Sequence, residues 1–305
     1  MIPVLFLYGA TASGKTDLAV AIAERLPVRL ISVDSLAVYR HFNIGSAKPD
    51  AAVQERYPHT LIDIREPEQV YSAGAFCKDA LELIEQARGA GQIPLLVGGT
   101  GLYFRSLERG IAPLPAADPE LRARIVAEAQ VLGWPALHGR LAAMDPLRAH
   151  AIAPQDGQRI QRALELCLLG QGAAEHWGEG LLGPIWKLWL RPERPALHRR
   201  IEERLQAMFA AGLVEEAQAL FPSYGEQDLP ACRAVGYRQL FAWLRGKQSL
   251  AQARERILYA TRQLAKRQET WFASESADWI LDPGQSLARW EVLRDLELRF
   301  QKLTN

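Results

Sequence analysis

The sequence predicts an α/β protein, in which a parallel sheet carries helices on both faces and a helical insertion interrupts the chain. Two observations lead to this fold class. Short apolar runs alternate with amphipathic segments over roughly the first hundred residues. The alternation stops near Pro113 and Pro115, and an apolar run returns only at Ile185. Alternation of this kind is typical of strands that are each followed by a crossover helix.

Four apolar runs in the first part are expected to be strands, at residues 4–8, 28–33, 61–64 and 94–97. Helical spacing separates them, as in Leu18, Ile22 and Leu26, which lie four residues apart. A further helix is expected around residues 80–87.

A helical insertion is expected next because helix-start signals recur while strand patterns are absent. Asp118 before Pro119 has the order of an N-cap and a first helical residue, and Gly133 closes that helix. Asp145 before Pro146 repeats the signal. A further helix is expected at residues 156–169, and five glycines at residues 170–183 favour a linker.

The last part returns to the sheet. A strand is expected at residues 185–190, helices dominate residues 196–272, and residues 279–281 fit an edge strand. The expected organisation is therefore a first core part, an insertion and a second core part, at residues 1–113, 114–183 and 184–305.

The composition is that of an ordinary globular protein and excludes disorder, collagen-like repeats and coiled coils. The chain has 305 residues, of which 49% are hydrophobic and 23% charged. Its 36 basic and 35 acidic residues give a net charge of +1, which taken alone indicates no preference for nucleic acid or membrane. The three cysteines lie far apart in the sequence, which disfavours a disulfide framework and a zinc site. The expected location is therefore the reducing cytoplasm. No stretch approaches the roughly 20 apolar residues of a membrane span.

A phosphate-binding loop follows the first apolar run. The pattern G-x4-G-K-[ST] lies between an expected strand and an expected helix, as in P-loop NTPase-like folds. Its backbone N–H groups and the helix N-terminus favour an anion. Lys15 is expected to reach the outer phosphates, and the Thr16 hydroxyl is expected to hold Mg²⁺. The loop comprises Gly9, Ala10, Thr11, Ala12, Ser13, Gly14, Lys15 and Thr16.

Asp34 is the carboxylate placed to act beside this loop. Nucleoside triphosphatases usually have an acidic Mg²⁺ ligand after an inner strand, but the run at residues 94–97 continues into Gly98-Gly-Thr-Gly101. Asp34 instead follows the run ending at Val33, at the sheet edge where ligands bind. It could also be only a helix N-cap. A phosphate cradle with one carboxylate suits transfer chemistry on a diphosphate-like group.

Basic residues are concentrated in the last third. Residues 231–268 contain nine basic residues and one acid, Glu255, a net charge of +8, so the other residues sum to −7. The helix expected at residues 251–272 would carry them opposite its apolar face. A second polar helix face begins at Gln158 and Arg162. A charged helix face of this kind is often only solvated. The two faces together, beside a phosphate loop, favour a nucleic-acid substrate such as single-stranded RNA or a splayed base.

These features together resemble the bacterial type of the tRNA dimethylallyltransferase (tRNA isopentenyltransferase) family. The resemblance extends over nearly the whole chain. It rests on the phosphate loop and on motifs at residues 31–35, 38–39, 44–49, 61–63, 71–74, 97–103, 158–165, 234–239, 260–268 and 270–271.

The resemblance implies transfer of a dimethylallyl group from dimethylallyl diphosphate to a flipped adenine base of tRNA. The acceptor would be N6 of the adenosine 3′ to the anticodon (position 37), in tRNAs that read codons beginning with U, and diphosphate would be released. Asp34 would act as general base. Thr16 and Mg²⁺ would bind the leaving diphosphate, while Lys15 and Arg204 would neutralise the charge that develops on it.

The resemblance also implies where tRNA binds. The insertion would close on the anticodon stem-loop, and no membrane, obligate protein partner or oligomer is required. The expected tRNA contacts are Asp34, Ser35, Leu36, Ala37, Thr100, Arg122, Gln158, Arg159, Ile160, Gln161, Arg162, Arg233, Ala234, Val235, Gly236, Tyr237, Arg238, Lys266, Arg267, Gln268 and Trp271. The chain departs from the family pattern at Ala10, Ala37, Thr60 and Ala75, none of which removes a catalytic group.

Two other functions remain open at this level. A small-molecule kinase could use the same loop, with Asp34 activating an alcohol, but the charge of +8 argues against it. A nucleotide-gated RNA-binding protein would not need Asp34 at the end of a strand.

Overall fold

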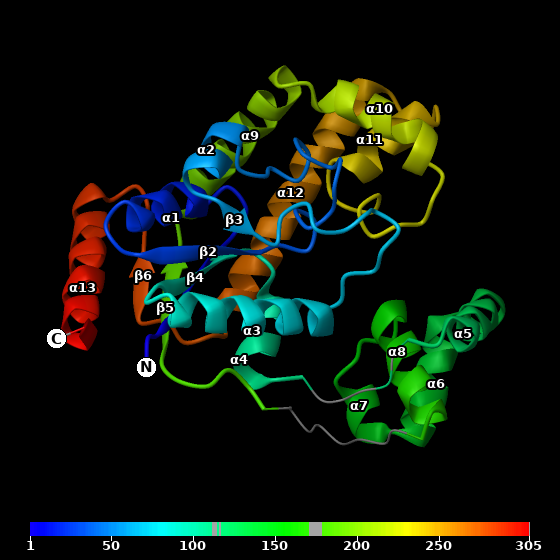
Figure 1. Cartoon of the computed structure of the whole chain (residues 1–305). Coiled ribbons are helices and arrows are strands. Elements are labelled where there is room, and N and C mark those ends of the chain that lie inside the picture. Colours follow the sequence, from blue (N-terminus) through cyan, green and yellow to red (C-terminus); the bar gives the residue numbers. More distant parts are fainter. Residues whose placement is uncertain (112–114, 116, 171–178, 305) are drawn as a thin grey trace. The chain divides into compact units, whose positions relative to one another are not determined.

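The computed structural model (Figure 1) describes residues 1–111, 115, 117–170 and 179–304, which form two compact units. Unit 1 comprises Met1–Glu108 and Leu181–Asn305, and unit 2 comprises Arg109–Gly180. The sequence placed the corresponding boundaries after residues 113 and 183. Of the glycine-rich stretch expected to be a linker, residues 171–178 lie outside the described part.

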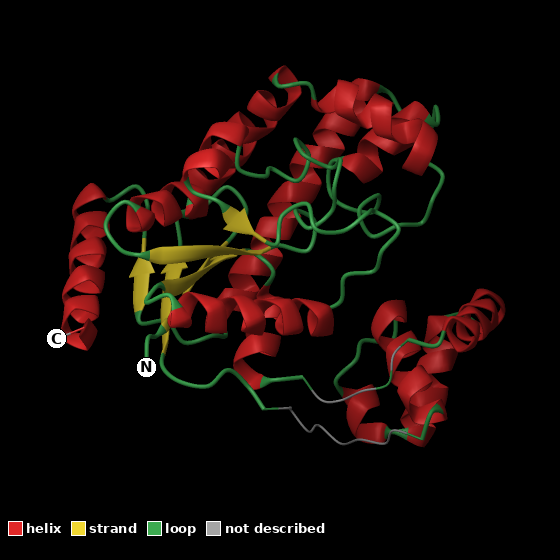
Figure 2. Ribbon diagram, viewed as in Figure 1, coloured by secondary structure: helices red, strands yellow, loops and turns green. Residues whose placement is uncertain are grey.

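Unit 1 is built on a parallel sheet, seen as yellow arrows in Figure 2. All its strand pairs are parallel. The expectation that residues 185–190 rejoin the sheet and that residues 279–281 form its edge is confirmed. Within the described residues the strand order is β3-β2-β4-β1-β5-β6, with β1 at Val4–Gly9, β2 at Val28–Val33, β3 at His59–Thr60, β4 at Ile93–Gly98, β5 at Ile185–Leu190 and β6 at Trp279–Leu281.

The strand expected at residues 61–64 is wrong. Strand β3 ends at Thr60, because Leu61 and Asp63 adopt φ angles of 64° and 56°. This left-handed conformation cannot continue a strand. The segment instead bonds the loop that follows β2, where the Ile64 amide donates to the Val38 carbonyl at 3.0 Å.

Helices cover both faces of the sheet, as the sequence predicts. Side chains alternate along β1, so Leu5 and Leu7 pack on one face and Phe6 and Tyr8 on the other. The first face is covered by α1 (Lys15–Ala23) and α13 (Ser286–Thr304). The second is covered by α3 (Ala73–Gly89), α4 (Gly101–Arg109) and α12 (Leu250–Phe272).

The second core continues beyond the sheet into a group of helices. Tyr8 stacks on Phe272 of α12 with ring centroids 4.7 Å apart, which seats that helix against β1. Ser249 caps the start of α12 by accepting from the Gln252 amide. The other helices of this core are α9 (Arg194–Ala210), α10 (Leu213–Tyr224) and α11 (Tyr237–Leu244). The short helix α2 (Ala51–Arg56) buries none of its residues.

The described residues of unit 2 form four helices, and three of these begin at the Asp residues that the sequence indicates. The helix at Trp134–Met144 is not among those that the sequence predicts. Asp118, Asp145 and Asp156 each accept a hydrogen bond from the amide three residues later. A separate small core includes Leu141 and Ile160. The helices are α5 (Pro119–Leu132), α6 (Trp134–Met144), α7 (Pro146–His150) and α8 (Gly157–Leu168). Across both units, no helix among the described residues is long and apolar enough to span a membrane.

Candidate functional site

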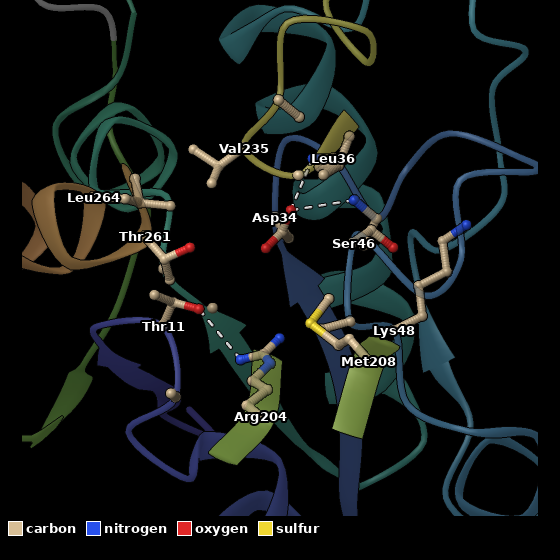
Figure 3. A pocket seen from close by; sticks show the side chains of 18 of the residues that line it. Thr11, Asp34, Leu36, Ser46, Lys48, Arg204, Met208, Val235, Thr261 and Leu264 are labelled. Atoms are coloured by element: carbon tan, nitrogen blue, oxygen red, sulfur yellow. Dashed lines mark hydrogen bonds between the residues drawn. The ribbon is translucent and has the colours of Figure 1, made fainter. Parts of the chain in front are cut away.

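A cavity of about 1090 Å³ opens at the carboxyl ends of the central strands of unit 1 (Figure 3). The phosphate loop follows β1, Asp34 follows β2, and the turn at Gly99 and Thr100 follows β4. Because these three strands are neighbours in the sheet, residues far apart in the sequence line one cavity. Ligands of parallel sheets bind at this edge.

The phosphate loop is shaped to receive an anion. Gly14 has a φ angle of 95° and precedes α1 directly, without a side-chain cap for the first turn of that helix. The loop is also packed tightly, since an added Cβ on Gly9 would lie 2.5 Å from the Leu190 carbonyl oxygen. The N-terminal amides of α1 are therefore open to a ligand on the cavity side.

Lys15 folds back over its own loop. Its Nζ donates to the carbonyl oxygens of Gly9 at 3.0 Å and Ala10 at 2.7 Å. Burial, and then the nearby Arg204 guanidinium, lower the pKa of Lys15 to about 7. A phosphate would restore the missing negative charge around this ammonium group.

Two arginines of α9 reach the loop from the other side of the cavity. Arg204 Nη1 donates to Thr11 Oγ1 at 3.2 Å, and burial lowers the pKa of Arg204. Arg200 Nε donates to the Ala12 carbonyl at 2.8 Å. Sequence reasoning named Arg204 and missed Arg200, although a spacing of four residues on a predicted helix placed both on one face.

Asp34 serves both a local turn and the cavity. Its Oδ1 accepts from the amides of Leu36 at 2.7 Å and Ala37 at 3.1 Å. The alternative interpretation of Asp34 as only a helix N-cap is wrong, because residues 35–38 form a turn and the next helix begins at Ala51, but this oxygen does cap that turn. Oδ2 is not used by the turn, and Figure 3 shows the carboxylate facing the cavity.

The cavity wall near Asp34 is largely apolar. Leu36, Met208, Val235 and Leu264 lie around it in Figure 3. On the opposite wall, Lys48 is tied down by bonds from its Nζ to the Tyr39 carbonyl and Asp63 Oδ1, both at 2.6 Å. The cavity thus combines a cationic phosphate end with a wall suited to a short hydrocarbon.

Most residues expected to touch tRNA in unit 1 line this cavity or lie beside it. Lys266 is exposed on α12, and Trp271 lies under the Arg105 guanidinium, 4.0 Å from its ring centroid. Arg233 is paired with Asp228. The lining includes Asp34, Ser35, Leu36, Ala37, Thr100, Arg233, Ala234, Val235, Gly236, Arg238, Arg267 and Gln268.

Two of the residues expected to contact tRNA have side chains that are not exposed to solvent. Tyr237 is fully buried, and its hydroxyl donates to Glu216 Oε1 at 2.5 Å. Ile160 is fully buried in the core of unit 2. Both were assigned as members of a contiguous stretch, and the helical period turns such members inward.

Glu216 is a positioning residue that sequence reasoning missed. Its carboxylate accepts from the amides of Asn43, Ile44 and Gly45 at 2.9–3.1 Å, in addition to the Tyr237 hydroxyl. These bonds hold a loop that continues into the cavity wall at residues 45–49. No local sequence signal indicates such a contact, because its partners lie far apart in the chain.

Within unit 2, two of the expected tRNA contacts, Arg122 and Arg162, bind a buried carboxylate. Glu165 is fully buried and accepts from Arg122 Nε and Nη2, both at 3.0 Å, and from Arg162 Nη1 at 2.6 Å. Burial alone would raise the pKa of Glu165, but these hydrogen bonds overcome it and hold the pKa at about 2. The Asp118 amide donates to the same carboxylate at 2.7 Å.

The residues present fit Mg²⁺ only as a partner of a phosphate ligand. Among the described residues, no three acidic, histidine or cysteine side chains gather to hold a metal ion. Thr16 and Asp34 both line the cavity. Mg²⁺ commonly keeps several waters and takes substrate phosphate oxygens, with one or two ligands from the protein. The Thr16 hydroxyl can supply such a ligand, beside the phosphate oxygens of the donor.

Comparison with known proteins gives one consistent result. The family model described as IPP transferase matches residues 37–275, and the one described as isopentenyl transferase matches residues 2–66. The chain is 56% identical over 289 residues to a tRNA dimethylallyltransferase of Acidithiobacillus ferrooxidans, covering 93% of this chain and 91% of that one. It is 53% identical over 279 residues to the corresponding protein of Alkalilimnicola ehrlichii, covering 90% and 88%.

Solved structures agree. A tRNA isopentenylpyrophosphate transferase from Bacillus halodurans is 32% identical, with a TM-score of 0.70 and coverage of 100% of this chain and 99% of that one. A eukaryotic dimethylallyltransferase acting on tRNA has a TM-score of 0.79 at 24% identity, covering 98% and 78%, which supports the fold alone.

Proposed function

This chain belongs to the tRNA dimethylallyltransferase (isopentenyl transferase) family, and we propose that its cavity brings dimethylallyl diphosphate and a tRNA adenine together. Family membership supports the reaction expected from the sequence. A dimethylallyl group passes to N6 of the adenosine at position 37, in tRNAs that read codons beginning with U, and diphosphate is released. One observation carries the assignment: the phosphate loop, Asp34 and the basic helix α12 contribute to the same cavity.

The chemistry divides between the two ends of the cavity. The adenine amine forms a bond from N6 to the allylic carbon, and the bond from that carbon to the diphosphate oxygen breaks. Asp34 would take the proton that N6 loses. Lys15 and Arg204 would stabilise the charge that develops on the departing diphosphate, together with the N-terminal amides of α1, and their shared position in the cavity supports this role.

Thr16 would hold Mg²⁺ together with the phosphate oxygens of the donor. The bound ion would supply further charge neutralisation for the leaving group. Donor binding measured with and without a chelator tests this assignment independently of turnover, and equal affinity would remove Thr16 from that role.

The tRNA contacts follow from the same placement. We assign phosphate contacts to the exposed Lys266 and Arg267 of α12, and further contacts to unit 2 through its polar residues around Gln158 and Arg162. The apolar wall near Asp34 suits the dimethylallyl chain. The cytoplasmic location stays a prediction.

Incubation with tRNA and dimethylallyl diphosphate, followed by mass spectrometry of the nucleosides, tests the proposal. We expect an adenosine heavier by one isoprenyl unit, and none when the donor is omitted. Consumption of ATP with no such product would favour the kinase. Retention of tRNA without any product would favour the binding protein.

A further inference from the structure

Gln268 is turned into the molecule, although it was expected to contact tRNA. Its Oε1 accepts from the Thr11 amide at 2.8 Å, and its Nε2 donates to the Gly99 carbonyl at 3.0 Å. A primary amide is the side chain that offers an acceptor and a donor at one end. Gln268 therefore links the phosphate loop to the turn after β4.

The turn after β4 is shaped around this side chain. A Cβ added to Gly99 would lie 2.5 Å from Gln268 Nε2, and one added to Gly98 would lie 2.0 Å from the Val33 carbonyl oxygen. Both glycines therefore permit an approach that a larger residue would prevent. The turn lies close to α12 on one side and to the end of β2 on the other.

Each partner of Gln268 leads to one half of the reaction. On the diphosphate side, Thr11 also receives the hydrogen bond from Arg204. On the other side, Thr100 follows Gly99, and its hydroxyl accepts from the amide of Ser35 at 3.2 Å. Ser35 is the neighbour of Asp34. The Gln268 side chain thus links, by hydrogen bonds, the loop that would bind the diphosphate to the turn that supports Asp34, the proposed proton acceptor.

We propose that Gln268 is a positioning residue that sets the separation between the phosphate loop and the turn supporting Asp34. This inference rests on the proposed function and adds a role that the tRNA-contact assignment did not include. Gln268 follows Lys266 and Arg267 directly on α12. Contacts that orient α12 therefore also orient the two loops to which its amide is bonded.

Three variants test the proposal. Gln268→Met keeps the length of the side chain and removes both hydrogen bonds. Gln268→Glu can still accept from the Thr11 amide, but it cannot donate to the Gly99 carbonyl. Gln86→Glu makes the same chemical change on the exposed face of α3 and is the matched control. The full chain is used throughout, with thermal unfolding measured for each variant.

We expect kcat at saturating tRNA and donor to fall roughly 10- to 100-fold in Gln268→Met, because misplaced reacting groups lose rate steeply. Gln268→Glu should fall at least as far, because it places a carboxylate oxygen against the Gly99 carbonyl oxygen, to which Nε2 now donates at 3.0 Å. In Gln268→Met, which changes no charge, the tRNA Kd and its dependence on salt should stay within about twofold of the wild-type values, because Gln268 contributes no charge to the phosphate contacts. Gln86→Glu should match the wild type in all three measurements.

Three outcomes would overturn the inference. A raised tRNA Kd with unchanged kcat in both Gln268 variants would make the residue a tRNA contact. Unchanged values throughout would leave it without a role. A loss of kcat only in proportion to a lower thermal midpoint, in both variants, would make it a general stability residue. If the wild type formed no isoprenylated adenosine, the proposed function itself would fail, which is a separate result.

Discussion

Replacement of Asp34 separates its two roles. Asp34→Asn keeps Oδ1 for the Leu36 and Ala37 amides and loses the basic oxygen facing the cavity. Asp34→Ala loses both. Each hydrogen bond is worth about 0.5–1.5 kcal/mol net, so Asp34→Ala should lower the free energy of unfolding by about 1–3 kcal/mol relative to Asp34→Asn. Both variants should lose roughly 10²- to 10⁴-fold in kcat, the usual contribution of a general base.

Single-turnover formation of isopentenyl-adenosine and urea unfolding measure these two effects. Asp282 provides a matched control, because its Oδ1 accepts from the Gly284 amide at 2.9 Å in a comparable turn after β6. Asp282→Ala and Asp282→Asn should differ in stability and leave turnover unchanged. The reasoning would be refuted by an Asp34→Asn variant that turns over at a rate near that of the wild type. A tRNA Kd that rose sharply in Asp34→Asn would instead make Asp34 chiefly an anchor.

Three further results are expected. Because burial lowers the pKa of Lys15 to about 7, the ammonium is lost as pH rises through that value. Donor affinity, measured by titration calorimetry, should then weaken above pH 7 in the wild type but not in Lys15→Arg. Glu165→Gln should destabilise α8 by about 3 kcal/mol, seen as roughly 100-fold faster amide exchange. Glu128→Gln, which removes half of an exposed pair in the same unit, should cost less than about 1 kcal/mol. Replacement of Lys266 or of Arg267 by a neutral residue should each lower the slope of log tRNA affinity against log salt concentration by roughly one. An unchanged slope would show that this face of α12 is only solvated and does not contact phosphates.

The sheet could be predicted because its strands are continuous apolar runs. Those at residues 4–8 and 94–97 are buried throughout, and those at residues 28–33 and 185–190 are buried over their last four residues, a property that composition reveals directly. The failure at residues 61–64 has a different origin. That run is apolar as well, but its backbone conformation is set by the loop at Val38 with which it bonds.

The site could be predicted only where its chemistry is local. The phosphate loop is a contiguous motif, and Asp34 is marked by its place at the end of a strand. Gln268 lies 257 residues from Thr11, and Glu216 lies 173 residues from Asn43. No spacing rule indicates contacts at such separations, because only the folded sheet brings their partners together.

The position of β1 between β4 and β5 has a consequence for synthesis on the ribosome. When residues 1–180 have emerged, β1 can pair with β4, but its other edge lacks the strand that will cover it. The sheet gains β5 only after unit 2 has been made, and Arg204 and Gln268 emerge later still. An exposed strand edge is prone to pairing with other chains. The nascent protein therefore passes through a stage in which one edge of its central strand is uncovered and the cavity still lacks the walls that Arg204 and Gln268 supply.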